Sequence, residues 1–330
     1  MKKRSFNKLL FASLAGITAP LMHGLAQAQA TGWPDKPVKI INMFPAGGLA
    51  DNISRAVAQR LSAAWGQPVV VENRPGANGI IAADAVSKSA ADGYTLFWAN
   101  DAAISINPFM YDKLPYNPQT DLVPVSVVAE TVECLIVSGD LPVSNVRELI
   151  QYAKANPGKL NYGSFGKGSL AHLSGEAFNS ATGAGLVHVP FKGVAEVVPA
   201  MLSGQIQVLF TAQGTPMQFI KNGKLKALAV FSQSRQPTLP NVGTAREQGL
   251  NMEARAWFGL MAPAKTPADV VSKIAVEVAK ISKSKEFREK VLDDIGLESV
   301  GSSPSEFAVM LRGDRDKYSR QVKAANVKLE

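Results

Sequence analysis

The sequence predicts an α/β fold in which helices cover a parallel sheet. Short apolar runs rich in β-branched residues alternate with amphipathic helical segments, and loops containing glycine connect them. The chain has 330 residues, which is more than one hydrophobic core usually serves, so we expect two domains. Residues 31–127 and 236–330 are predicted to form a discontinuous first domain, and residues 128–235 the second.

Residues 1–30 have the features of a secretory signal peptide. Four basic residues open the chain, an apolar stretch runs from Leu9 to Ala26, and Ala28-Gln29-Ala30 supplies the small residues that a signal peptidase reads. We therefore predict cleavage before Thr31 and export to the periplasm. No later segment has the uninterrupted apolar length of a membrane span.

Composition excludes several classes of function. The formal net charge of +8 falls to about +4 once the four basic residues of the leader are removed, which is too little for a nucleic-acid-binding surface. Cys134 is the single cysteine, so the core must hold the exported chain together without an internal disulfide. Only His172 and His188 follow the leader, which leaves little material for a zinc site or a Cys-His nucleophile. We expect no metal and no cofactor.

The first half alternates strands and helices. Ile53, Val57, Leu61 and Trp65 recur every four residues and predict a helix that Gly66 ends. The predicted strands are residues 38–43, 68–72 and 94–98, and the predicted helices are residues 52–65 and 80–87.

The second half repeats this order and ends in helices. We expect strands at residues 121–128, 133–137, 160–164, 188–193, 208–211, 227–231 and 257–263. We expect helices at residues 143–156, capped by Ser144 or Asn145, and at 170–178, 194–203, 244–249, 267–282, 285–295 and 305–325. Residues 232–240 read as a linker or a return crossing, and the helical tail is expected to pack on the first domain.

Two glycine loops lie where a predicted strand leads into a helix. The first is Phe44-Pro45-Ala46-Gly47-Gly48-Leu49-Ala50-Asp51, and Gly163 to Ser169 repeats the design. Unpaired N–H groups and the positive end of the helix dipole suit an anion at such a place. Taken alone, the first loop is more simply explained as a tight turn that needs glycine, with Asp51 as an ordinary helix cap.

Motifs for common enzymatic chemistry are missing. Gly168 separates Lys167 from Ser169, so the second loop is not a Walker A loop, and the Gly47-Gly48 spacing does not match a dinucleotide fingerprint. Tyr162 stands where a nucleophile elbow around Ser164 needs glycine. The sequence gives no argument for an enzyme.

Several motifs together resemble the substrate-binding proteins of tripartite tricarboxylate transporters, the TctC or Bug family. They are Trp33-Pro34-Asp35-Lys36-Pro37, Phe44 to Gly48 with Asp51 and Arg55, Val71 to Gly79, Asp92 to Leu96, Asn161 to Ser164 with Gly168, Ser169, His172 and Leu173, and Val189 to Gly193. The resemblance covers essentially the whole chain after the leader. It implies a type II periplasmic binding protein-like fold, with two α/β domains, two crossing strands and a ligand cleft between the domains.

The resemblance also implies a set of ligand-binding residues. They are Phe44, Ala46, Gly47, Gly48, Asp51, Asn78, Ser164, Gly168, Ser169, His172 and Lys192. Backbone N–H groups of both loops would hold the carboxylate, with Asp51 capping the helix and steadying the first loop and Asn78 offering an amide. His172 can equally be a packing residue, Lys192 a solvated one and Ser169 only a cap.

Two departures from the family pattern bear on the ligand. Gln207 stands where many relatives have Asp, and Phe191 where Tyr is frequent. Both favour mono- or dicarboxylic acids over amino acids as the ligand.

The resemblance implies a periplasmic solute-binding protein that delivers a small organic carboxylate to a permease of a large and a small subunit. The alternative is a periplasmic sensory adaptor that binds the acid and signals to a sensor kinase. A secreted hydrolase is a third class, and it predicts turnover of esters or amides. We expect a monomer and no nucleic-acid partner.

Overall fold

Ten strands join in one hydrogen-bonded sheet within the residues that the computed structural model describes, 32–214 and 216–325. The strands are β1 (Val38–Asn42), β2 (Val69–Asn73), β3 (Thr95–Asn100), β4 (Leu122–Ser138), β5 (Asn161–Ser164), β6 (Val187–Pro190), β7 (Val208–Ala212), β8 (Leu225–Val230), β9 (Arg255–Pro263) and β10 (Glu298–Ser299). The sheet order is β2-β1-β3-β9-β4-β7-β5-β6, and β8 and β10 also pair with β4. The predicted signal peptide lies outside the described residues.

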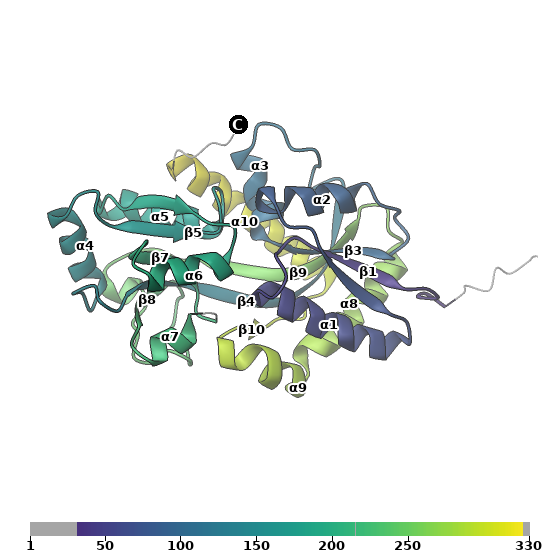
Figure 1. The fold of residues 1–330 in the computed structure, drawn as a ribbon. Coiled ribbons are helices and arrows are strands. Elements are labelled where there is room, and N and C mark those ends of the chain that lie inside the picture. The colour runs from purple at the N-terminus through teal and green to yellow at the C-terminus, as the bar shows by residue number, and fades with distance from the viewer. Residues whose placement is uncertain (1–31, 215, 326–330) are drawn as a thin grey trace, which may run out of the picture. The chain divides into compact units, whose positions relative to one another are not determined.

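Ten α-helices flank this sheet in the described chain (Figure 1). They are α1 (Leu49–Trp65), α2 (Ile80–Ser87), α3 (Asn107–Met110), α4 (Val146–Ala155), α5 (Leu170–Thr182), α6 (Val194–Leu202), α7 (Met217–Lys221), α8 (Ala268–Lys283), α9 (Lys285–Phe287) and α10 (Pro304–Ala325). Short 3₁₀ turns lie at Ala77–Gly79, Arg246–Gln248 and Asp293–Ile295, and π turns at Ala102–Ile106 and Arg288–Leu292. None of the described helices is long and apolar enough to cross a membrane.

The sheet contains two parallel groups, as the alternating pattern predicts. Strands β2, β1 and β3 are parallel, and α1 and α2 make the connections between them. Strands β6, β5 and β7 form the second parallel group, with α5 and α6 between them. The expectation of a parallel sheet is nevertheless incomplete, because β4 and β9 pair antiparallel with each other and with these groups.

Strand β4 joins the two groups without a break. Its first part, up to Val132, pairs with β9. From Glu133 onward it pairs with β7, and from Cys134 onward it also pairs with β8. The two strands predicted at residues 121–128 and 133–137 are therefore one. The expected domain boundary between residues 127 and 128 falls inside this strand.

Side chains of β4 alternate between two layers of core. Leu135 and Val137 pack with the cluster that contains Tyr162, whereas Cys134 and Ile136 pack with the cluster of α6 and α7. This follows from the two-residue period of a strand, which points successive side chains to opposite faces. Helices cover both faces of the sheet here.

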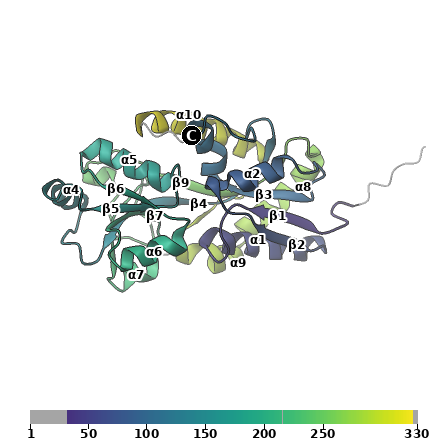
Figure 2. The ribbon, with the colours of Figure 1, turned by 45° about the horizontal axis from the view of Figure 1, so that its top comes forward.

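The C-terminal helices differ from the prediction in two respects. The segment predicted as one helix over residues 285–295 is short α9 followed by a π turn and a 3₁₀ turn. Helix α10 contacts α3, α8 and also α5, so the tail packs on more than the first domain (Figures 1 and 2).

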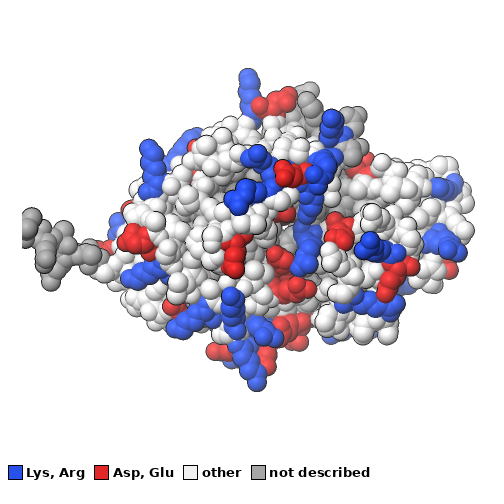
Figure 3. Space-filling model, turned by 180° about the vertical axis from the view of Figure 1, so that it is seen from behind, with Lys and Arg blue, Asp and Glu red and all other residues white. Residues whose placement is uncertain are grey.

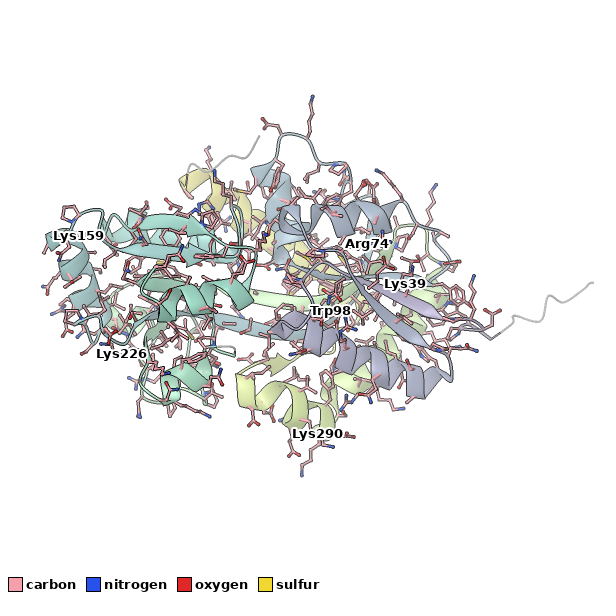
Figure 4. The ribbon with its side chains drawn as sticks, viewed as in Figure 1. Lys39, Arg74, Trp98, Lys159, Lys226 and Lys290 are labelled. Atoms are coloured by element: carbon pink, nitrogen blue, oxygen red, sulfur yellow. The ribbon has the colours of Figure 1, made fainter. Side chains whose placement is uncertain are left out.

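Charged side chains of both signs are interspersed on the face shown in Figure 3. Ion pairs also occur in the first group of strands, where Lys39 and Arg74 both pair with Glu72, at 2.9 and 2.6 Å. Figure 4 marks both cations together with Trp98, which is fully buried on β3. The face in Figure 3 has no extended basic surface for a polyanion.

Candidate functional site

The loop between β1 and α1 is organised around the carboxylate of Asp51, which is only 2 % exposed. Its Oδ2 accepts hydrogen bonds from Gly47 N and Arg55 Nε, both at 2.9 Å. Its Oδ1 accepts from Asn73 Nδ2 at 2.7 Å, and the same amide donates to the carbonyl of Phe44. The carboxylate therefore ties the loop to α1 and to β2.

Asp51 supports the loop but does not cap the helix. The N-cap of α1 is Gly48, which makes no side-chain cap bond, and Asp51 lies in the first turn. Burial opposes ionisation of Asp51, but bonds from Arg55, Asn73 and Gly47 outweigh it and keep the pKa below its ordinary value. The carboxylate is consequently charged at neutral pH.

Several N–H groups at this helix start have no acceptor among the described residues. The first helical bond runs from Asn52 N to Gly48 O, and no bond is made by the N–H groups of Ala46, Gly48, Leu49 or Ala50. Gly47 differs from the expectation, because its N–H donates to Asp51. The donor set at α1 therefore starts with Ala46 and Gly48 and continues into the helix, which favours an anion here.

Phe44 closes the apolar side of this loop. Its ring is half-buried and lies edge-on to Phe258 of β9, with centroids 5.8 Å apart. It packs against the core of the first strand group. Both roles considered from the sequence, core filling and lining an apolar part of the site, fit this position.

The loop between β5 and α5 is bonded more completely. The buried Ser164 places its Oγ 2.6 Å from His188 Nε2, and Gly166 N donates to the same oxygen at 3.2 Å. Gly168 N donates to Nδ1 of His172 at 3.1 Å. Ser169 is the N-cap of α5, and its N–H and hydroxyl both donate to Gly166 O.

These bonds change which donors α5 offers. The N–H groups of Gly168 and Ser169 have internal acceptors, and the Ser164 hydroxyl is occupied within the loop. The N–H groups of Leu170 and Ala171 in the first turn make no bond within the described chain. The unbonded N–H groups at the start of α5 therefore begin at Leu170, one residue after Ser169, the last donor predicted from the sequence.

His188 was not among the predicted site residues, although it contacts two that were. Its ring stacks on His172, with centroids 4.0 Å apart and planes 19° apart, and on Tyr162 at 4.9 Å. Burial is the main cause that lowers the pKa of both histidines, to about 4 for His188. Parallel pairing sets Tyr162 opposite His188, and this register is not readable from the sequence.

The two strand groups meet beside these loops. Asn78 Nδ2 donates to Gly168 O at 3.2 Å and to Asn107 Oδ1 at 2.9 Å. A Cβ placed on Gly193, the N-cap of α6, would lie 3.8 Å from Cγ of Pro45. The predicted residues of the first and second strand groups thus come together in space.

Two other predicted features lie differently. Lys192 is exposed, and its N–H donates to Glu196 Oε2 at 3.1 Å. Gln207 lies at the start of β7, where its Oε1 accepts from Asn161 N at the opposite end of β5 from the glycine loop. The argument that Gln207 disfavours an amino-acid ligand therefore loses its basis, whereas Phe191 does lie beside the loop, with its N–H bonded to Ser164 O.

Two hollows of the described surface lie away from these loops. One of about 360 Å³ is lined by Lys283, Ser302 and Phe307, and one of about 520 Å³ by Thr238, Lys283 and Arg288. Neither includes a residue of the two glycine loops. In the described chain no group of three or more His, Cys, Asp or Glu side chains is placed to hold a metal ion.

Comparison with known proteins identifies the family. Residues 53–327 match the family model TctC, described as tripartite tricarboxylate transporter family receptor. Protein BugT of Bordetella pertussis is 32 % identical over 323 residues, which cover 97 % of this chain and 97 % of BugT.

Solved structures agree with this match. Rpa4515 of R. palustris with adipate superposes with a TM-score of 0.86 at 33 % identity, covering 90 % of this chain and 99 % of that one. MatC of Rhodopseudomonas palustris with bound malate has a TM-score of 0.82 at 28 % identity, with coverages of 88 % and 99 %. The fold is thus that of the family's periplasmic binding proteins, as the sequence predicted. The chain belongs to the TctC/Bug family of periplasmic solute-binding proteins, which are not enzymes.

Proposed function

We propose that this protein captures a small organic mono- or dicarboxylate between its two glycine loops and delivers it to the membrane subunits of a tripartite tricarboxylate-type transporter. The carrying observation is that the N-termini of α1 and α5 both offer unbonded N–H groups, while the Asn78–Gly168 bond joins the turn before α2, in the first strand group, to the loop before α5. Each helix end carries a partial positive charge, so the pair suits a ligand with negative charge.

Relatives support this ligand class. Rpa4515 is described with adipate and MatC with malate, and both are dicarboxylates. We infer that Ala46, Gly48, Leu170 and Ala171 donate to the acid, while Asp51 holds the first loop in shape. Asp51 itself is too well bonded, and too negative, to contact a carboxylate directly.

We propose that the two strand groups act as two domains. The hinges are β4, where the chain crosses to the second group, and the segment before β9, where it returns to the first. Closure of the two around the ligand would then present one conformation to the permease. The Asn78–Gly168 bond supports closure, because it connects the turn before α2, in the first strand group, to the loop before α5 in the second.

The test is a ligand screen on the protein lacking residues 1–30. Native mass spectrometry of the protein as purified would reveal a retained acid, and thermal shift would rank adipate, malate, succinate, benzoate, glutamate, glucose and putrescine. We expect stabilisation by the dicarboxylates or benzoate. Stabilisation by glucose or putrescine alone would refute carboxylate capture.

Delivery needs a separate measurement. Vesicles that contain the large and small permease subunits encoded beside this protein should accumulate the identified acid only when the protein is added. Binding without any accumulation would leave capture intact and contradict the transport role.

A further inference from the structure

A cluster of polar side chains lies behind the loop between β5 and α5. Its members are Tyr162, Ser164, His172, Glu176 and His188. The three rings form a stack in which His188 lies between His172, at 4.0 Å, and Tyr162, at 4.9 Å. All five come from β5, β6 and the first two turns of α5.

The two imidazoles hold the loop at two points. His188 Nε2 lies 2.6 Å from Ser164 Oγ, which accepts from Gly166 N, and His172 Nδ1 accepts from Gly168 N. Gly166 and Gly168 have φ values of +109° and +83°, so the loop has a backbone conformation that few other residues adopt. Its shape therefore depends on both rings.

The bond from Gly168 fixes the charge of His172. A ring nitrogen that accepts a hydrogen bond cannot carry a proton, so His172 is neutral with its proton on Nε2. Protonation would remove the acceptor of the Gly168 N–H and place a cation 4.0 Å from a second imidazole. Either change destabilises the hydrogen-bonded conformation of the loop.

The charged groups around the rings shift the histidine pKa values in opposite directions. Burial is the largest cause that lowers the pKa of His172, with Glu176 opposing it and Lys167 assisting it. For His188, burial comes first, followed by His172 and Lys167. Tyr162 donates to Glu176 Oε1 at 2.6 Å, which ties that carboxylate to the same cluster.

We propose that His172 and His188 are a pair of positioning residues that hold the second loop in its ligand-binding form only while both rings are neutral, so that capture weakens in acid. The proposal rests on the proposed function for its effect on binding. The ring and loop chemistry stands on its own and can be measured without a ligand.

The first experiment uses nuclear magnetic resonance of the ligand-free protein. Residues 31–330 contain only these two histidines, so a long-range ¹H–¹⁵N spectrum distinguishes both rings and their tautomers. We expect His172 to carry its proton on Nε2 at pH 7, both rings to titrate below pH 6.5, and the protection of the Gly168 amide, corrected for the intrinsic pH dependence of exchange, to fall as they do. A charged ring at pH 7, or Gly168 exchange that ignores the titration, would overturn the proposal.

The second experiment measures binding of adipate and malate by calorimetry from pH 7.5 to pH 4.5. The comparison protein is the double variant His172→Asn with His188→Gln, which keeps an acceptor or donor near each bonded nitrogen but cannot titrate. Each protein is normalised to its own affinity at pH 7.5, because the acids titrate in the same range. We expect the natural protein to lose about threefold or more affinity at pH 4.5 relative to the variant, mainly through His172, because His188, with a pKa of about 4, is still largely neutral there.

Further outcomes separate the alternatives. His172→Asn should retain more affinity at pH 7.5 than His172→Phe, which lacks an acceptor for Gly168. Tighter binding by the natural protein in acid would mean that the rings act as cationic ligand contacts, which contradicts the proposal. If neither acid binds at any pH, capture of these acids fails, and the resonance experiment still decides the role of the rings.

Discussion

Single residues set the geometry of the first loop. Asp51 accepts the Gly47 N–H, and Gly47 has a φ of +80°, so the carboxylate and the glycine together turn the chain into α1. A Cβ on Gly47 would meet nothing within 4 Å. The requirement for glycine here is thus conformational and not one of space.

Replacing Gly47 by alanine should therefore weaken ligand binding through the backbone. We expect a stability loss of about 1–2 kcal/mol, because alanine at positive φ is strained, and a loss of affinity as the loop relaxes and moves the Ala46 and Gly48 N–H groups. Urea unfolding measures the first effect and calorimetry with adipate the second.

Gly66 provides a matched control. It also has positive φ, +66°, and open space at its Cβ, but it ends α1 away from the loop. Gly66→Ala should cost similar stability and leave affinity unchanged. Equal affinities for both variants would show that the first loop does not bind the acid.

At the scale of single residues, the supporting role of Asp51 could be predicted from the sequence and that of His188 could not. The support role of Asp51 was predicted from the family resemblance, since a carboxylate there would repel an anionic ligand, but the capping role expected with it was wrong. His188 was missed because its importance comes from strand register and ring stacking. Neither is encoded in local spacing.

Among the elements, β4 carries the connection between the two strand groups. Glu133 lies where its pairing passes from β9 to β7, and its Oε2 accepts from Ser174 Oγ of α5 at 2.5 Å. Burial, assisted by Asp101, raises the pKa of Glu133 to about 8, although the Ser174 bond opposes the shift. The side chain is consequently protonated at neutral pH.

This buried acid should make stability fall as pH rises. The folded state keeps the Glu133 proton up to about pH 8, whereas the unfolded chain loses it near 4.5. The folded state thus binds more protons in this window, and the free energy of unfolding decreases with pH across it. Denaturant unfolding from pH 5 to pH 9 should show Glu133→Gln gaining stability relative to the natural protein.

Glu253→Gln, at an exposed position, is the control for the loss of one carboxylate. It should follow the pH dependence of the natural protein throughout. A Glu133→Gln curve parallel to the natural one would mean that the Glu133 carboxyl is already ionised in the fold.

Elements were predicted best where their signals are local. The start of α4 at Asn145 and the end of α1 at Gly66 follow from capping chemistry. The continuity of β4 through Ala129 to Val132 was missed, because it depends on pairing with β9, more than a hundred residues later in the chain. Tertiary pairing of this kind leaves no local pattern.

For the molecule as a whole, the bond between Asn78 and the loop before α5 links the two strand groups, and the proposed capture depends on this link. Asn78 has a φ of +52° and bridges Asn107 and Gly168 with one amide. Asparagine tolerates this conformation better than most residues, and it supplies the donor as well. The same side chain thus shapes its own turn and reaches the opposite loop.

Asn78→Gly should leave the turn unstrained and remove both bonds. We expect faster release of the bound acid, by about fivefold, since one net hydrogen bond contributes about 1 kcal/mol to the closed form. Stopped-flow displacement measures the rate. Asn251→Gly, at an exposed position, is the control, and an unchanged release rate for Asn78→Gly would mean that this bond does not hold the closed form.

The burial of Cys134 makes the chain its own reporter of local opening within the second strand group. This single thiol lies fully buried in β4, opposite Thr211 of β7 and Val230 of β8, and burial raises its pKa to about 12. A thiol reagent can therefore modify it only during excursions that part these strands and let the thiolate form. Labelling rates, with and without a bound acid, would measure how often these strands part and whether the acid suppresses this opening, without introducing any probe.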